Sequence, residues 1–173
     1  MTEDDLSTLD AWLRLPHVAR WWLSAATAEA EITKYRRRIA ETRPATTMLM
    51  ATEDHTSIGW CQWYRWAEYP ADAAAMEAQG NEVGIDYAIG DLTCIGRGRG
   101  TGLVAALVRE VRRYRPTTGL LVAPDATSVA SRRVLEKNSF DLVAVRPVAT
   151  EPSDNPMAIY RLPGLREPRA EPR

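Results

Sequence analysis

The segment Ile95–Leu103 reads IGRGRGTGL, so glycine occupies every second position from 96 to 102. Glycine lets a backbone approach a ligand closely, and the apolar spacing from Thr101 to Tyr114 predicts an amphipathic helix that begins directly at this loop. The N–H groups at a helix start point outward at the positive end of the helix dipole. The segment therefore predicts a phosphate-binding site, to which Arg97 and Arg99 add positive charge, and a plain tight turn is the alternative.

The spacing of the loop excludes two common phosphate-binding motifs. A P-loop ends in Gly-Lys-Ser/Thr, whereas Thr101 follows Gly100 here and the loop contains no lysine. A dinucleotide-binding fold places G-x-G-x-x-G after its first strand, whereas this loop lies in mid-chain and reads G-x-G-x-G-x-G. The phosphate ligand therefore has to be identified from other residues.

Carboxylates precede the loop. Four acids, Glu68, Asp72, Glu77 and Glu82, fall in the insertion before the strand that carries Asp86, and no Lys or Arg occurs between Glu68 and Gly96. A carboxylate can take the proton of an attacking amine, and a group of carboxylates can attract and pair with a polycation. This segment favours a cationic acceptor molecule, with a solvated charged face as the alternative.

The elements that must position these residues follow from periodicity and turn signals. Helices are predicted over Asp10–Leu23 (opened anew at Pro16), Ala25–Glu41, Thr101–Tyr114 and Ser128–Asn138, the last with Val129, Val134 and Leu135 facing inward. Strands are predicted over Thr46–Thr52, Ser57–Ala67, Glu82–Ile89, Gly119–Val122, Phe140–Val148 and Met157–Leu162. Between Pro70 and Gly80 the insertion predicts a short helix. This order is mixed α/β, with one parallel step in the middle.

Composition and charge limit the function class. A chain of 173 residues forms one domain with a proper core, and its formal net charge of −1 gives no reason to expect nucleic acid or an anionic membrane as partner. No apolar run could span a bilayer and the acidic start is unlike a signal peptide, so the expected location is the cytoplasm. Cys61 and Cys94 are predicted to be reduced core thiols, and no metal site is expected.

Two segments of the second half resemble one known family. The glycine loop is similar to the acyl-CoA loop of the GNAT superfamily of N-acetyltransferases, Q/R-x-x-G-x-G/A, with Ile95 at the Gln/Arg position and Gly98 and Gly100 matching. Further on, Leu135–Phe140 (LEKNSF) resembles the Y-E-K-x-G-F of that family. Two matches in the right order are more specific than either alone, and the resemblance implies an acyl-CoA ligand.

The first half is similar to the aminoglycoside 6'-N-acetyltransferases within that superfamily. Trp12–Trp22 (WLRLPHVARWW) resembles their W-L-x-x-P-H-x-x-x-W-W opening, and Ile58–Tyr64 (IGWCQWY) resembles their I-G-Y-x-Q-x-Y strand. The run Gly84–Asp86 matches a G-I-D that precedes the glycine loop. The resemblance then spans most of Trp12–Leu162.

This resemblance implies a set of site residues, each with a plain structural alternative such as a core aromatic or a turn residue. It implies that Asp86 is catalytic and that the acceptor is bound by Trp22, Glu68, Asp72, Glu82, Asp86 and Asp154. It implies that acetyl-CoA, the co-substrate, is bound by Ile89, Ile95, Gly96, Arg97, Gly98, Arg99, Gly100, Thr101, Gly102, Ser128 and Arg132.

Three positions depart from the family pattern. Leu135 replaces the tyrosine that protonates the leaving CoA thiolate in many members, so that either Tyr87, Tyr114 or solvent takes this role or the thiolate leaves without an acid. Ala123 stands where the family has an aspartate before proline, so one carboxylate is either missing or shifted to Asp125. Ser128 replaces the asparagine that opens the following helix, where it could cap the helix or contact the cofactor.

The sequence thus predicts a mixed α/β protein of GNAT fold, with a mostly antiparallel central sheet, a parallel and splayed central pair of strands, and flanking helices. Residues 1–164 are expected to form a single acetyltransferase domain and residues 165–173 a disordered tail. The predicted function is direct acetyl transfer to an amine of an aminoglycoside or similar polycation, of the antibiotic-resistance or self-protection type. The alternatives are another amine (siderophore lysine, polyamine or protein N-terminus) and a non-catalytic CoA-binding module. The chain is expected to act as a monomer or homodimer.

Overall fold

The computed structural model describes residues 1–23, 26–151 and 153–165. Its helices are α1 (Leu6–Leu13), α2 (Pro16–Trp22), α3 (Ala28–Ala40), α4 (Pro70–Met76), α5 (Arg99–Tyr114) and α6 (Val129–Lys137), with 3-10 turns at Glu3–Asp5, Trp66–Glu68 and Leu92–Cys94. Its strands are β1 (Thr46–Glu53), β2 (Thr56–Arg65), β3 (Val83–Ile89), β4 (Leu120–Val122), β5 (Asp141–Arg146) and β6 (Met157–Leu162).

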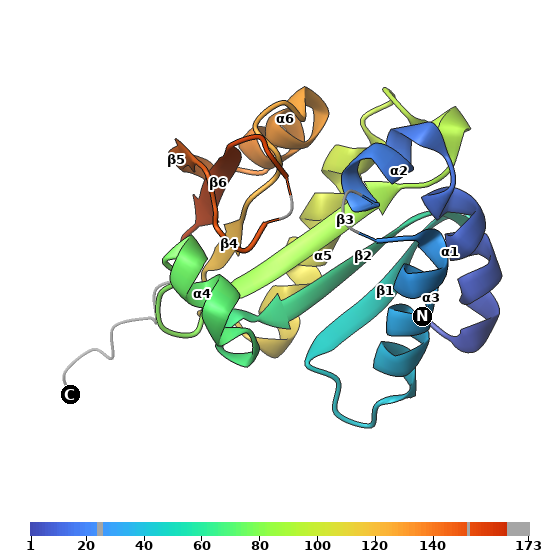
Figure 1. Cartoon of the computed structure of the whole chain (residues 1–173), viewed down its shortest axis with the longest axis horizontal. Coiled ribbons are helices and arrows are strands. Elements are labelled where there is room, and N and C mark those ends of the chain that lie inside the picture. Colours follow the sequence, from blue (N-terminus) through green and yellow to red (C-terminus); the bar gives the residue numbers. More distant parts are fainter. Residues whose placement is uncertain (24–25, 152, 166–173) are drawn as a thin grey trace, which may run out of the picture.

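These strands form one sheet in the order β1-β2-β3-β4-β6-β5, shown in Figure 1. Every neighbouring pair is antiparallel except β3 and β4, which are parallel and share one register pair, Val83 with Leu120. Because β3 continues to Ile89 while β4 ends at Val122, the two strands separate beyond that pair. The predicted GNAT fold with its splayed central strands is therefore confirmed.

Helices cover both faces of the sheet. Successive residues of a strand point to opposite faces, and Trp60 of β2 packs in a core cluster with α1, α2 and α3, whereas Cys61 packs in a second cluster with α5 and α6. Figure 1 shows α1 and α3 over β1 and β2, with α5 behind the sheet. Each β3 residue can therefore be assigned to one face or the other.

The insertion before β3 forms the third core cluster. The prediction that β2 reaches Ala67 is wrong, because the strand ends at Arg65 and a 3-10 turn follows. In this turn Trp66 is buried and its indole Nε1 donates a hydrogen bond to the Leu121 carbonyl at 3.2 Å. The contact fixes the insertion, with its predicted helix α4, against β4 near the Val83–Leu120 pair, where β3 and β4 are still joined.

The phase of α6 differs from the prediction in one residue. Leu135 is buried, as expected, but Val129 is 53% exposed. The helix is fixed instead by a polar contact, in which the Tyr160 hydroxyl of β6 donates to Glu136 at 2.7 Å and accepts from Arg132 Nε at 3.2 Å. This contact decides which α6 side chains face the splay.

The predicted tail falls outside the described residues, apart from Leu165. Within the described ranges, no helix has both the length and the apolar character needed to cross a bilayer.

Candidate functional site

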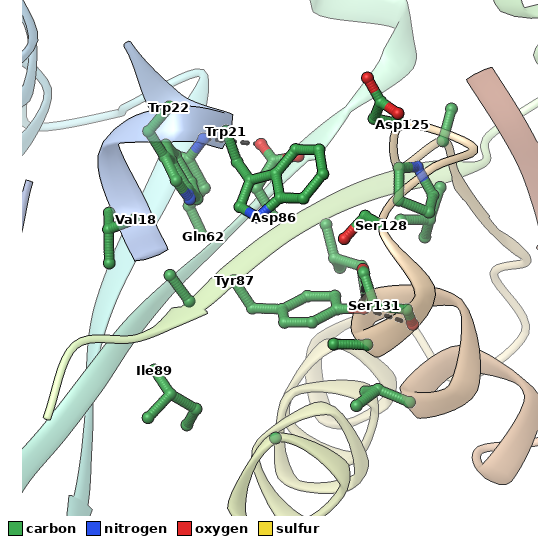
Figure 2. A pocket seen from close by; sticks show the side chains of 18 of the residues that line it. Val18, Trp21, Trp22, Gln62, Asp86, Tyr87, Ile89, Asp125, Ser128 and Ser131 are labelled. Atoms are coloured by element: carbon green, nitrogen blue, oxygen red, sulfur yellow. Dashed lines mark hydrogen bonds between the residues drawn. The ribbon is translucent and has the colours of Figure 1, made fainter. Parts of the chain in front are cut away.

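A cavity of about 950 Å³ opens where β3 and β4 separate. Its walls come from β3, the glycine loop, the first turn of α5, the segment after β4, α6, α2, α3, α4 and the loop before β6. Figure 2 shows Trp21, Asp86 and Tyr87 on one side of this cavity and Ser128 and Ser131 on the other. Side chains from distant parts of the sequence thus meet in one place.

Neighbouring residues of β3 present different chemistry to the two faces of the sheet. Asp86 lies opposite Gln62 in the β2–β3 register, and Tyr87 lies opposite Cys61. Asp86 therefore faces the side of α2 and α3, while Tyr87 faces the side of α5 and α6. A molecule from each side can meet at this strand, because the splay leaves the sheet open there.

Asp86 is a buried carboxylate with a hydrogen bond to one of its two oxygens. Burial raises its pKa above the usual value, whereas a hydrogen bond from Gln62 Nε2 to Oδ2, at 2.7 Å, and the charges of Arg38 and Lys34 act to lower it. Burial is the largest of these effects. Such a carboxylate is well suited to accept a proton near neutral pH.

Two tyrosines, Tyr87 and Tyr114, were predicted as alternative proton donors, and of these two Tyr87 lines the cavity. Its hydroxyl lies 2.7 Å from Ser131 Oγ on α6, and burial raises its pKa well above the usual value, so it remains protonated. Tyr114 is 62% exposed at the end of α5 and stacks on Trp63. Leu135, in place of the family tyrosine, is buried in the core.

The glycine loop has the backbone conformation that glycine allows. Gly96 and Gly98 have φ of +73° and +78°, and α5 begins immediately afterwards at Arg99 rather than at Thr101. Gly98, Gly100 and Thr101 line the cavity at this helix start. Gly102 lies outside the cavity, and its amide donates to the Gly98 carbonyl at 3.2 Å, so its prediction as a cofactor-binding residue is not supported by its position.

Positive charge gathers at the loop end of the cavity. Arg133 and Lys137, one helical turn apart on α6, line it together with Arg99, whose Nε also pairs with Glu53 at 2.8 Å. The predicted Arg132 instead points away, to Tyr160 and to the Ala126 carbonyl at 3.3 Å, and Arg97 lies outside the cavity lining. The remaining predicted cofactor residues, Ile89, Ile95, Gly96 and Ser128, line it.

Three carboxylates lie in the part of the cavity around Asp86, which the α3 cations Lys34 and Arg38 also line. Asp72 of α4 and Glu151 line the cavity with Asp86, and the pKa of Glu151 is raised, first by burial and then by the charges of Asp86 and Asp72. Sequence reasoning missed Glu151, because a single acid in a loop carries no pattern. The charges of Asp86 and Asp72 thus act on Glu151, and a bound cation would relieve the repulsion among the three carboxylates.

Three predicted acceptor-binding acids lie elsewhere. Glu82 is 7% exposed and pairs with Arg161 Nε at 2.7 Å, so the prediction that it borders the acceptor cleft is wrong. Glu68 pairs with Arg65 and lies outside the cavity lining, as does the exposed Asp154. All three were predicted from their acidic side chains. Ion pairs hold Glu82 and Glu68, and Asp154 lies outside the cavity lining.

Aromatic rings form the wall beside Asp86. Trp22 lines the cavity as predicted, but its ring also packs on the core residue Trp60 with centroids 5.0 Å apart. Its neighbour Trp21, which the sequence did not single out, points into the cavity in Figure 2, and the Arg20 guanidinium lies 4.3 Å from its ring centroid. Trp22 thus lines the cavity and also packs against the core, and its contact with an acceptor stays a prediction.

Asp125 organises the rim after β4. Burial acts to raise its pKa, but hydrogen bonds from Thr127, Asn155 and Ser153 prevail and lower it to about 2. Asp125 therefore lines the cavity as a charged carboxylate and also joins the α6 start to the loop before β6. Ser128 stands at the N-cap of α6 without a side-chain capping bond, which leaves its hydroxyl for the cavity.

Cys94 is half-buried in the cavity wall rather than in the core, so the prediction of a core thiol holds for Cys61 and is wrong for Cys94. In the described ranges, no three His, Cys, Asp or Glu side chains gather in a way that could hold a metal ion.

Residues 1–146 match the model of the acetyltransferase (GNAT) domain family. The chain belongs to the GNAT acetyltransferase family. It is an acyltransferase that uses acetyl-CoA, and the loop fits this co-substrate: two left-handed glycines, a helix start, and Arg99, Arg133 and Lys137 are all suited to phosphate groups.

Curated relatives of this GNAT enzyme include aminoglycoside N(6')-acetyltransferase type 1 of Klebsiella pneumoniae and of Serratia marcescens. Each is 27% identical to it over 150 residues, which cover 82% of this chain and 71% of the relative.

Among solved structures, the GNAT enzyme is similar to AAC(6')-Ib in complex with ribostamycin and coenzyme A. The TM-score is 0.75 at 23% identity, over 94% of this chain and 90% of that one. It is also similar to aminoglycoside N(6')-acetyltransferase from Legionella pneumophila, with a TM-score of 0.71 at 17% identity, over 94% and 88% of the two chains. At these identities the likeness shows the shared fold.

Proposed function

We propose that this enzyme transfers the acetyl group of acetyl-CoA directly to an amino group of an aminoglycoside or a similar polycationic amine. The observation that carries the proposal is the division of charge within one cavity. Asp72, Asp86 and Glu151 line one part of the cavity together with Lys34 and Arg38 of α3, and Arg99, Arg133 and Lys137 line the part at the glycine loop and α6, where no acid of the described lining pairs with Arg133 or Lys137. The first group favours a polycation and the second favours phosphates, so the two substrates would be sorted to opposite ends.

Two side chains of β3 would handle the protons. Acetyl-CoA supplies an acetyl group activated as a thioester. Asp86 would accept a proton from the acceptor amine as its nitrogen forms the new bond to the acetyl carbon. As the carbon–sulfur bond breaks, the Tyr87 hydroxyl would donate to the departing sulfur from the opposite face of the strand. Overall, one proton leaves the amine and one reaches the sulfur.

Direct transfer is supported over an acyl-enzyme route. Cys94 is the thiol in the cavity wall, and its hydrogen-bond partner is the Thr93 hydroxyl at 3.9 Å, which is not a base that could activate it. The names of the curated relatives support an aminoglycoside as the acceptor, and its acetylation would serve antibiotic resistance or self-protection.

The test is release of free thiol from acetyl-CoA with a panel of acceptors: two aminoglycosides, a linear polyamine, a lysine side-chain amine and a peptide with a free N-terminus. The highest kcat/KM is expected for an aminoglycoside. Asp86→Asn should lower that kcat/KM by about a hundredfold or more, because the proton acceptor is lost.

Asp141→Asn, on the exposed β5, is the matched control and should keep wild-type rates. Preference for the peptide or the lysine amine would favour the second acceptor class instead. Full activity of Asp86→Asn across the pH range would refute the role of that residue.

A further inference from the structure

Gln62 is a buried polar side chain that the transfer reaction itself does not require. It is 6% exposed and lies directly opposite Asp86 in the register of β2 and β3. Its Nε2 donates to Asp86 Oδ2 at 2.7 Å, and its Oε1 accepts from Arg38 Nη1 at 3.0 Å. The amide therefore connects a cation on α3 to the carboxylate in the cavity.

This connection fixes the orientation of both side chains. The Arg38 guanidinium can only donate, so the amide oxygen of Gln62 must face Arg38 and its nitrogen must face Asp86. Within the described residues, the Asp86 carboxylate has one hydrogen bond, which its Oδ2 accepts from Gln62. The carboxylate lines the cavity, and Oδ1 is the oxygen left for an incoming amine.

We propose that Gln62, held in place by Arg38, is a positioning residue that orients Asp86 with one carboxylate oxygen toward the acceptor and keeps that carboxylate ionised. The inference rests on the proposed role of Asp86 as proton acceptor. Burial alone would favour the protonated form, which cannot accept the proton of an amine.

Other charged and titratable groups also act on Asp86. From the elements packed around it, these are Lys34, Tyr35 and Arg38 of α3, Tyr64 of β2, Tyr87 of its own strand, Asp72 of α4 and Glu151. The α3 cations favour ionisation of Asp86, although Lys34 also pairs with Glu31 of the same helix, and the charges of Asp86 and Asp72 raise the pKa of Glu151. Because the tyrosines have raised pKa values, they stay neutral through the range in which Asp86 titrates.

The sign of the expected effect follows from these contacts. Gln62→Leu removes a hydrogen bond to the charged form, and Arg38→Met removes a favourable charge together with the anchor of the amide. Both changes raise the pKa of Asp86. The acidic limb of the pH profile of kcat/KM should therefore move to higher pH, by about 1 to 2 units for Gln62→Leu and by less for Arg38→Met.

The deciding measurement is NMR titration of the Asp86 carboxyl carbon in the enzyme without substrates, for the wild type, Gln62→Leu, Arg38→Met and the control Arg37→Met. Arg37 is exposed on α3 and lies outside the cavity lining. A higher midpoint in the first two variants, an unchanged one in the control, and recovery of activity at high pH are expected. Arg38→Met keeps the test open if Gln62→Leu fails to fold.

An unchanged midpoint in both variants, or a loss of activity of equal size at every pH, would overturn the proposal. The NMR titration needs no acceptor and no acetyl-CoA. It therefore separates failure of this inference from failure of the proposed function, which the thiol-release panel tests.

Discussion

Asp86 and Tyr87 are consecutive residues that reach opposite faces of one sheet. A strand places neighbouring side chains on opposite sides by its geometry alone. The splay between β3 and β4 then gives both side chains access to one cavity. The proposed proton acceptor and proton donor therefore face the cavity from opposite sides of the sheet, with room for the two substrates between them.

Tyr87→Phe tests the donor half of this arrangement. Removing the hydroxyl deletes the hydrogen bond to Ser131 and the group proposed to meet the departing sulfur. We expect kcat to fall by about a hundredfold, with little change in the Kd of coenzyme A, because the hydroxyl would act mainly on charge that develops in the transition state.

Tyr114→Phe is the matched control, since that side chain is exposed at the far end of α5. Steady-state kinetics and coenzyme A titration of both variants provide the measurement. Equal rates for Tyr87→Phe and Tyr114→Phe would assign protonation of the sulfur to solvent.

At the scale of elements, the glycine loop and the start of α5 form one unit, which we propose binds the phosphates of coenzyme A. Gly98 and Gly102 make an informative pair, because a Cβ at either position would meet no atom within 4 Å. They differ in backbone: Gly98 has φ of +78°, whereas Gly102 lies inside α5. Comparison of the two alanine variants therefore isolates conformation from steric contact.

Gly98→Ala should weaken coenzyme A binding by roughly 5- to 30-fold, since a non-glycine residue in the left-handed region costs about 1–2 kcal/mol. Gly102→Ala should leave the Kd unchanged and raise thermal stability slightly, because alanine is the better helix former. Calorimetric titration and thermal unfolding give both quantities. Equal loss of affinity in the two variants would contradict the assignment of the loop.

The elements explain what the sequence could and could not reveal. The loop and its helix were predictable, because the backbone conformation of the glycines and the amphipathic spacing depend only on residues near in sequence. The phase of α6 was not, because it depends on the contact of Tyr160 with Arg132 and Glu136, and a one-residue rotation exchanges Arg132 for Arg133 in the cavity. Likewise Glu82 is acidic in the sequence, but a partner distant along the chain, Arg161, neutralises it.

At the scale of the whole molecule, a net charge of −1 says little about the cavity, in which three acids lie near the α3 cations and a separate group of cations lies at the glycine loop. The charge at its acidic end comes from α4, β3 and the loop at Glu151, and that at its basic end from α5 and α6. Long-range attraction between a polycation and this acidic end weakens as salt is added. The charge division, rather than the total charge, accounts for the proposed acceptor preference.

Mass spectrometry of a competition reaction tests the central claim most directly. An aminoglycoside and a monoamine at equal concentration are incubated with acetyl-CoA and either the wild type or the double variant Asp72→Asn/Glu151→Gln. The wild type should acetylate mainly the aminoglycoside, less selectively at high salt, and the double variant should lose most of that preference. An unmodified aminoglycoside beside an acetylated monoamine would contradict the account.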